Sequence, residues 1–328
     1  MNKTLKYVLQ SILKAVSLIV AVSILTFVLA ELSPIDPIRA YVGAESGVSQ
    51  EQQALIAERW GLNEPPVTRF CKWGNALIHG DFGDSQLYHR PVLEVIKLAA
   101  GNSFILMSVS WILSGIFGFL LGILAAAYRD RWLDKAVRTF CYILSSTPTF
   151  WVGIIFLLVF SVSLGWFPIG MSTPIGAINS DVSILEKIHH MILPALTLSI
   201  TGVASLAMYT REEMVKVFNS EYALFAKARG ESTGEIIKRH GLRNILLPAV
   251  TIQFASLSEL FGGSVLAENV FSYAGLGGVT LEAGVKGDLP LLLGITIITS
   301  VVVFLGNMIA NLLYPVIDPR IKEGIHGI

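Results

Sequence analysis

Charged residues are scarce in this sequence. Of its 328 residues, 15% are Asp, Glu, Lys or Arg and 53% are hydrophobic, and the mean hydropathy is +0.64. Soluble chains carry about 25% charged residues, so this chain lacks the polar side chains that cover a water-soluble globule. Intrinsic disorder is excluded by the same numbers, because disordered chains are polar and strongly charged. The composition favours a protein embedded in lipid.

Cysteine is also scarce, and neither sign of charge is in excess. Cys71 and Cys141 follow no metal-binding or redox spacing, so a disulfide framework is excluded. Lys plus Arg number 24 and Asp plus Glu number 24, which gives a formal net charge of zero. This balance gives no indication of a nucleic-acid partner, so a charge signal has to come from where the charges lie.

Long apolar stretches, in contrast, are abundant. A hydrocarbon core about 30 Å thick requires roughly 20 apolar residues in a helix. Six stretches qualify: residues 11–32, 101–128, 140–164, 191–210, 245–268 and 289–317. The sequence therefore predicts an all-α integral membrane protein with six transmembrane helices. Lysines before the first stretch also fit a cleaved signal peptide, but its length and the five later stretches favour a retained helix.

The distribution of basic residues predicts how these helices are oriented. With the N-terminus inside the cell, most Lys and Arg fall on the inner side, and most of those outside lie in one long loop. Cytoplasmic loops carry the excess of Lys and Arg. We therefore predict a multi-pass protein of the plasma (inner) membrane with both termini in the cytoplasm.

This topology divides the chain into three parts. Residues 1–32 form the N-terminal tail and first span, residues 33–98 an extracytoplasmic loop, and residues 99–328 the other five spans. In the outer loop, residues 51–60 behind a Ser49 cap and residues 67–79 read as short helices, followed by a turn at 80–85. A segment of this size is too small for a buried core of its own, so we expect it to lie on the outer mouth of the spans.

The cytoplasmic loop at residues 211–245 is the most informative soluble segment. It is strongly basic, and apolar residues recur at helical spacing on both sides of Gly230 and Gly234. Residues 231–233 predict a turn with its own helix cap. The expected structure is a short helix, a glycine turn and a second short helix, which is too small for an enzyme domain. It is either a solvated loop packed on its own spans or a docking element for a cytoplasmic partner.

From Tyr222 to Pro248 this loop resembles the EAA loop of ABC-importer permeases. Further motifs match in order along the chain: Trp60-Gly61-Leu62, Gly80-Asp81-Phe82-Gly83, Pro148-Thr149-Phe150-Trp151, Glu268-Asn269-Val270-Phe271, Gly275-Leu276-Gly277 and Asp318-Pro319-Arg320-Ile321. The ordered set resembles the dipeptide, oligopeptide and nickel permease family, in the branch with a long first outer loop. The chain departs from the EAA pattern at Leu224 and Phe225, and Pro248 lies further from Gly230 than in the short-spaced motif.

The resemblance implies a type I ABC-importer permease fold, with a coupling helix that sits in a groove of a separate ATPase. The implied partners are a second homologous permease subunit, two ABC ATPase subunits, an extracytoplasmic solute-binding protein and the lipid bilayer, and no nucleic acid. No phosphate-binding P-loop sequence occurs, so the chain is expected to be no enzyme and to hold no cofactor, with ATP and Mg on the partner subunits. Peptides are the expected cargo, and nickel or a metal chelate is the alternative.

The residues expected to couple to the ATPase lie on either side of the glycine turn. They are Tyr222, Leu224, Phe225, Ala226, Ala228, Arg229, Gly230 and Glu231. Gly230 permits a positive φ or a close approach that a side chain would block. Ala226 and Ala228 permit close packing, while Leu224 and Phe225 offer apolar surface to a partner.

Polar residues within the spans are candidates for the transport path or a gate: Glu259, Gln253, Ser256, Ser145 and Asn307. An ionised carboxylate inside a membrane costs at least about 2–3 kcal/mol unless it is paired or hydrated, which makes Glu259 a functional candidate. A structural or gating role is favoured for it over contact with cargo. The other polar residues either line a water-filled path or hydrogen-bond between helices. His189 and His190 have no further ligand at a suitable spacing, so no metal site is expected.

Two other classes of function fit these features less well. A stand-alone ion-coupled transporter requires internal repeats and paired ionisable residues at mid-membrane, whereas the spans offer one such carboxylate and no clear repeat. A membrane-embedded enzyme requires a catalytic constellation in or beside the spans, and none is present in the sequence. The sequence thus predicts half of a translocation path, driven by ATP through alternating access.

Overall fold

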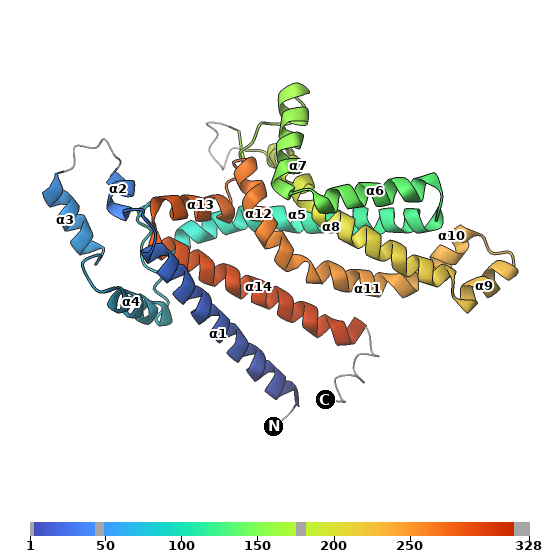
Figure 1. The fold of residues 1–328 in the computed structure, drawn as a ribbon, viewed down its shortest axis with the longest axis horizontal. Coiled ribbons are helices and arrows are strands. Elements are labelled where there is room, and N and C mark those ends of the chain that lie inside the picture. The colour runs from blue at the N-terminus through green and yellow to red at the C-terminus, as the bar shows by residue number, and fades with distance from the viewer. Residues whose placement is uncertain (1–2, 43–48, 175–181, 318–328) are drawn as a thin grey trace. The chain divides into compact units, whose positions relative to one another are not determined.

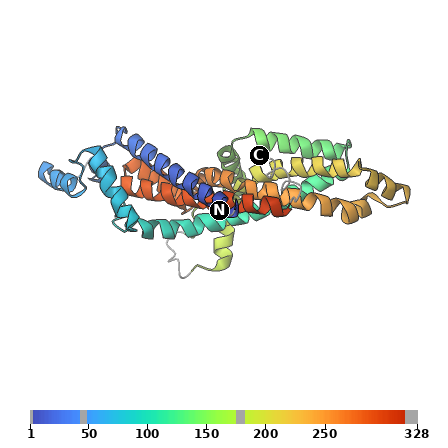
Figure 2. The same ribbon diagram turned by 90° about the horizontal axis from the view of Figure 1, so that it is seen from below.

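A computed structural model describes residues 3–42, 49–174 and 182–317, with side chains described between residues 12 and 308 of these ranges except at residue 258 (Figures 1 and 2). Helices dominate, and the one isolated β-bridge in the described ranges joins Asp84 to Pro91. The chain forms two compact units. The first unit comprises residues 1–102 and 275–304, and the second comprises residues 103–274 and 305–328.

The first unit is built from helices at the beginning and near the end of the chain. They are α1 (Lys3–Glu31), α2 (Pro37–Val42), α3 (Gln50–Arg59), α4 (Pro66–Ile78), the start of α5 (Val92–Ala127), α13 (Leu276–Lys286) and the start of α14 (Leu289–Ile317). Ser49 caps α3 through a reciprocal capping box with Gln52, so the predicted helix is confirmed. The predicted helix at 67–79 is confirmed as α4, and Gly80 and Gly83 have positive φ in the expected turn.

A buried carboxylate ties the loop before α5 to the start of α14. Asp288 is 1% exposed and accepts hydrogen bonds from Ser85 Oγ at 2.6 Å and from the backbone N–H of Leu87 at 3.0 Å. Beside it, Val92 on α5 and Leu291 on α14 are fully buried in one apolar cluster. The long loop therefore shares its core with helices distant in sequence, which compensates for its small size.

The second unit is arranged around α8 (Ile184–Phe218), a helix of 35 residues. The other helices are α6 (Trp132–Ser146), α7 (Thr149–Phe156), the π-helix η1 (Leu157–Ser163), α9 (Glu221–Ala228), α10 (Thr233–Ile236), the π-helix η2 (Ile237–Gly241), α11 (Leu242–Ala255) and α12 (Leu257–Val270). Helices α6, α7, α11 and α12 all contact α8. In both views α6 lies beside α8 (Figures 1 and 2).

Glycines allow α5 and α8 to pack closely in this unit. A Cβ at Gly118 would lie 2.9 Å from Leu206 Cβ, and a Cβ at Gly122 would lie 2.6 Å from the carbonyl oxygen of Ala207. Small residues four apart allow two helix backbones to approach in a membrane, as the Gly118-x-x-x-Gly122 pattern indicates.

Four helices are long and apolar enough to cross a membrane: Ile12–Glu31, Val92–Ala127, Ile184–Phe218 and Leu289–Met308. Two further spans are obtained if each bent helix pair counts as one, Trp132–Ser146 with Thr149–Ser163 and Thr233–Ala255 with Glu259–Val270. The predicted sixth span has the bounds of α14, while α8 continues through Phe218, well past the predicted end at residue 210. The described helices thus give four to six spans.

The prediction of a single continuous helix at residues 140–164 is wrong. The chain bends by 107° between α6 and α7, and Figure 1 shows α7 turned away from α6. Pro148 lacks an N–H and disfavours helical backbone in the residue before it, so Thr147 adopts extended angles, with φ −103° and ψ 129°. The predicted helix at 245–268 is likewise interrupted, by a 58° bend between α11 and α12.

Candidate functional site

Residues 220–241 form the candidate coupling element, which follows the end of α8 and leads into α11 (Figure 1). Ser220 caps α9 by accepting from the N–H of Ala223 at 3.4 Å. Ser232 caps α10 through a capping box in which Glu235 accepts from the N–H of Ser232 at 2.8 Å. The predicted order of short helix, glycine turn and short helix is confirmed.

Gly230 makes the turn between these helices. Its φ is +88°, and an added Cβ would meet nothing within 4 Å, so the glycine is required by backbone conformation and not by a close approach. The N–H of Gly230 donates to the carbonyl of Lys227 at 3.0 Å, and the N–H of Glu231 donates to that of Ala226 at 3.1 Å. These two bonds form a Schellman motif, which fixes the path of the chain as it leaves α9.

Opposite faces of α9 have different surroundings. Ala223 and Ala226 are 2% and 0% exposed and pack in one cluster with Ile236 of α10. Leu224 and Phe225, in contrast, are 56% and 65% exposed. Ala226 therefore packs closely as predicted. Ala228 is exposed and lies on the other side of the helix from the 223–226 face, so its close packing stays a prediction.

Charged groups connect the turn to η2. Glu231 is largely buried, and its carboxylate accepts from Arg229 Nη2 at 2.7 Å. Arg239 Nη1 and His240 Nε2 lie 3.7 Å and 3.5 Å from the same carboxylate. The guanidinium of Arg229 also lies 5.3 Å from the ring centroid of Phe225. Arg229 thus joins the turn to the exposed aromatic residue, and Arg239 of η2 lies near the same carboxylate, whereas His240 Nε2 makes no hydrogen bond to it. Sequence spacing alone had not placed Arg239 and His240 at this site.

The element is attached to the rest of the second unit by α8. Arg211 donates to both carboxylate oxygens of Asp134 on α6 at 2.6 Å, and Asp134 is fully buried. One turn later, Met214 packs against Gly241, where an added Cβ would lie 2.8 Å from the Met214 sulfur. The coupling element and α6 are therefore both joined to α8 by close contacts. The Asp134–Arg211 pair joins residues far apart in sequence, and nothing in the local sequence predicted it.

The predicted path residues occupy different environments. Gln253 is 7% exposed and joins α11 to α5, donating from Nε2 to the carbonyl of Trp111 at 2.7 Å and to Ser114 Oγ at 2.9 Å. Trp111 Nε1 donates back to the carbonyl of Gln253 at 2.7 Å, so this side chain bonds between helices. Ser256 lies at the bend between α11 and α12 and donates to the carbonyl of Gln253.

The remaining path candidates, Glu259, Ser145 and Asn307, are exposed in the single chain. A carboxylate that had not been predicted as a site residue, Glu268, is 1% exposed and accepts from Ser103 Oγ at 2.5 Å. Its only sequence signal was its place in a family motif. The motif at residues 318–321 lies outside the described residues.

His189 and His190 hydrogen-bond to backbone carbonyls of the segment that precedes α8. His189 Nε2 lies 2.9 Å from the carbonyl oxygen of Trp166, and His190 Nδ1 lies 3.0 Å from that of Gly170. Over the described ranges, no three His, Cys, Asp or Glu side chains gather at metal-binding distance. The two histidines thus hold the carbonyls of Trp166 and Gly170 against α8.

A family model described as "Binding-protein-dependent transport system inner membrane component" matches residues 118–323, which include the coupling element. The chain belongs to this family. It is 35% identical to the oligopeptide transport system permease protein of Bacillus subtilis over 317 residues, covering 96% of this chain and 99% of that protein. It is 32% identical to a putative peptide permease protein of Brucella suis and to the glutathione transport system permease protein of Salmonella paratyphi A, covering 97% of this chain and 99% of each relative.

Family membership confirms the resemblance found in the sequence. The protein is a multi-pass inner-membrane permease subunit of an ABC importer, and the ATPase is a separate polypeptide. A binding-protein-dependent system also implies a solute-binding protein as a partner.

Proposed function

We propose that this chain forms one half of the translocation path of an ATP-driven peptide importer and that residues 220–241 dock on the ATPase. The observation that carries the proposal is the exposed apolar face of Leu224 and Phe225 on an otherwise rigid two-helix element. Apolar and aromatic residues exposed on a rigid support are typical anchors of protein–protein interfaces. Tyr222, Arg229 and Glu231 would border this contact, while Ala226 and Gly230 maintain the shape of the element.

The proposed complex contains a second, similar permease subunit, two ATPase subunits that hold ATP and Mg, and an extracytoplasmic binding protein. Both termini are proposed to lie in the cytoplasm, which the distribution of Lys and Arg supports. Binding of ATP draws the two coupling elements together and opens the path outward, and hydrolysis resets it. Glu259, Ser145, Ser256 and Asn307 are proposed to line or gate this path once the two permeases pair, and Gln253 to support it from between helices.

Peptides are the proposed cargo. The relatives described above are named for oligopeptide, peptide and glutathione transport, and glutathione is itself a tripeptide derivative. None of these three names refers to nickel. His189 and His190 hydrogen-bond to backbone carbonyls.

The docking assignment is tested by Leu224→Ser in the reconstituted importer. Loss of an apolar anchor should weaken ATPase binding by more than about tenfold and reduce peptide-stimulated ATP hydrolysis. Leu185→Ser is the matched control, because Leu185 is 77% exposed but lies at the other end of α8. Equal ATPase binding by both variants would contradict the assignment.

A further inference from the structure

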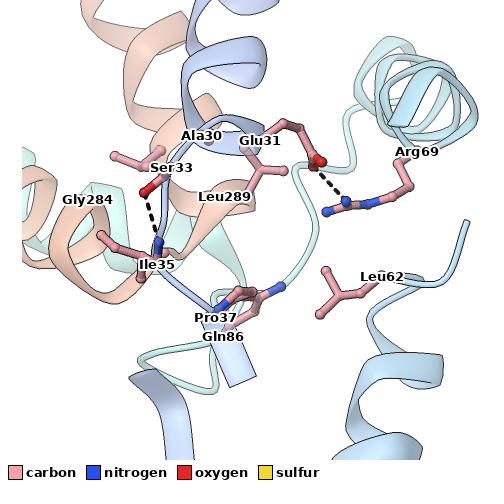
Figure 3. A pocket seen from close by; sticks show the side chains of 12 residues that line it. Ala30, Glu31, Ser33, Ile35, Pro37, Leu62, Arg69, Gln86, Gly284 and Leu289 are labelled. Carbon is pink, nitrogen blue, oxygen red and sulfur yellow. Dashed lines mark hydrogen bonds and ion pairs between the residues drawn. The ribbon is translucent and has the colours of Figure 1, made fainter. Parts of the chain in front are cut away.

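Three adjoining cavities in the first unit form what we call the span-end groove. Their volumes are about 210, 330 and 490 Å³, and Gln86 lines all three. The smallest is lined by Glu31 at the end of α1 and by Leu289 at the start of α14 (Figure 3). Both helices are candidate membrane spans, so the groove opens where two spans leave the hydrocarbon, at the depth of lipid headgroups.

Hydrogen-bond donors without a full set of acceptors converge on the middle cavity. Arg59 is exposed and makes no ion pair or hydrogen bond within the described residues. Trp73 also lines the cavity, but its Nε1 is closed to solvent. Arg69 donates from Nη1 to Glu31 at 2.6 Å, and Figure 3 shows these two side chains turned toward each other. The Arg59 guanidinium thus has its donors available, which suits this cavity to a ligand with an anionic group.

Acidic groups in the same cavity narrow the choice of ligand. Glu64 is paired with Lys72 at 2.5 Å, whereas Glu58 is exposed and has no ion pair within the described residues. An unpaired Arg59 next to an unpaired Glu58 complements a molecule that carries both a negative and a positive charge. Phosphatidylethanolamine has such a headgroup, with a phosphate and an ammonium.

The surroundings of the groove favour a lipid over a free solute. Leu29 and Leu32, at the end of α1, are 60% and 75% exposed and offer an apolar surface for acyl chains. Trp60 and Trp73 line the middle cavity, and tryptophan is enriched at the membrane–water interface because its ring is apolar and its N–H polar. Arginine recognises phosphate through several N–H donors held in a fixed plane.

We propose that the span-end groove binds the headgroup of a phospholipid, with its phosphate held by Arg59 and Arg69 and its ammonium by Glu58. The bound lipid fastens the long loop to α1 and α14. This inference is independent of cargo and of the ATPase contact.

Native mass spectrometry of the full-length chain in its purified importer tests the site, with dioleoyl phosphatidylethanolamine as the probe. Arg59→Gln removes an exposed, unpaired guanidinium, and Glu58→Gln removes an exposed, unpaired carboxylate. Each variant should weaken lipid retention by roughly fivefold to tenfold, since each removes a hydrogen bond to a charged group. Arg39→Gln is the matched control, because Arg39 lies on α2 of the same unit, lines none of the three cavities and should leave retention unchanged.

Three results would overturn the proposal. Equal retention of dioleoylglycerol, which has no phosphate, would show that the headgroup is not recognised. Unchanged lipid retention by Arg59→Gln and by Glu58→Gln would exclude the groove. Displacement of the lipid by trialanine from the wild type but not from Arg59→Gln would assign the groove to a peptide instead.

Discussion

At the scale of single residues, the second unit is constrained by close contacts between residues of different helices. Gly122 leaves no room for a side chain against α8, and Asp134 is fully buried with its charge neutralised by Arg211. Neither contact follows from local sequence, because each depends on which helices become neighbours. Gly118 and Gly122 indicated that some helix packs closely, and only the structure identifies that helix as α8.

Gly122→Val should destabilise the second unit. The new Cβ would lie 2.6 Å from the carbonyl oxygen of Ala207, so α5 and α8 must separate, at a cost of about 1–3 kcal/mol. Thermal unfolding of the detergent-solubilised chain measures this effect. Gly262→Val on α12 is the control, because a Cβ there meets nothing within 4 Å. Equal melting temperatures for both variants would contradict the α5–α8 packing.

Asp134→Asn should be more damaging still. It leaves the Arg211 guanidinium, 16% exposed, without its counter-charge, and breaking a buried ion pair on one side costs about 3–5 kcal/mol. Glu94→Gln disrupts the exposed Arg90–Glu94 pair and should change stability by less than about 1 kcal/mol. A denaturant titration of both variants gives the comparison, and similar midpoints would show that the buried pair is not structurally important.

At the scale of elements, the sequence predicted those features that depend on interactions between residues close together in the chain. The Ser49 capping box, the positive φ of Gly230 and the bounds of α14 are all encoded within a few residues, and all are found in the structure. The 107° bend at Pro148 had an equally local cause, but its apolar flanks suggested one continuous span. The links from Glu231 to Arg239 and His240 depend on the fold of the turn and had no comparable signal.

Gly230→Ala tests whether the shape of the coupling element matters for transport. A Cβ is strained at φ +88°, which costs roughly 1 kcal/mol or more and shifts α9 relative to α10. Peptide-stimulated ATP hydrolysis should fall while membrane insertion is unchanged. Gly234→Ala is the matched control, since Gly234 has no positive φ and open space around its Cα. A similar activity for both variants would show that the turn conformation is not needed for coupling.

At the scale of the whole molecule, the sequence predicted the class of fold but did not indicate which segments form one compact unit. The apolar stretches identified an all-helical membrane protein, and family membership confirms a permease. The pairing of residues 1–102 with 275–304 in one compact unit was not predictable, because it joins segments nearly 200 residues apart. Asp288 with Ser85 shows how such a unit is held together by a contact that no sequence window contains.

The native cysteines allow the predicted topology to be tested. Cys71 is exposed on α4, whereas Cys141 is buried against α8. A membrane-impermeant maleimide added to the extracytoplasmic face should label Cys71 and leave Cys141 unmodified. In a Cys71→Ser background, a cysteine introduced by Ser220→Cys should react only from the cytoplasmic face. Labelling of that cysteine from outside would contradict the predicted orientation.

The length of α8 has a mechanical consequence. At about 1.5 Å per residue, a helix of 35 residues reaches about 50 Å, whereas the hydrocarbon core is about 30 Å thick. The rotational position of its last turn therefore sets the direction in which Leu224 and Phe225 of the proposed ATPase contact point. One residue inserted after Val215 would rotate everything beyond it by about 100° and should turn that apolar face away from the proposed ATPase contact.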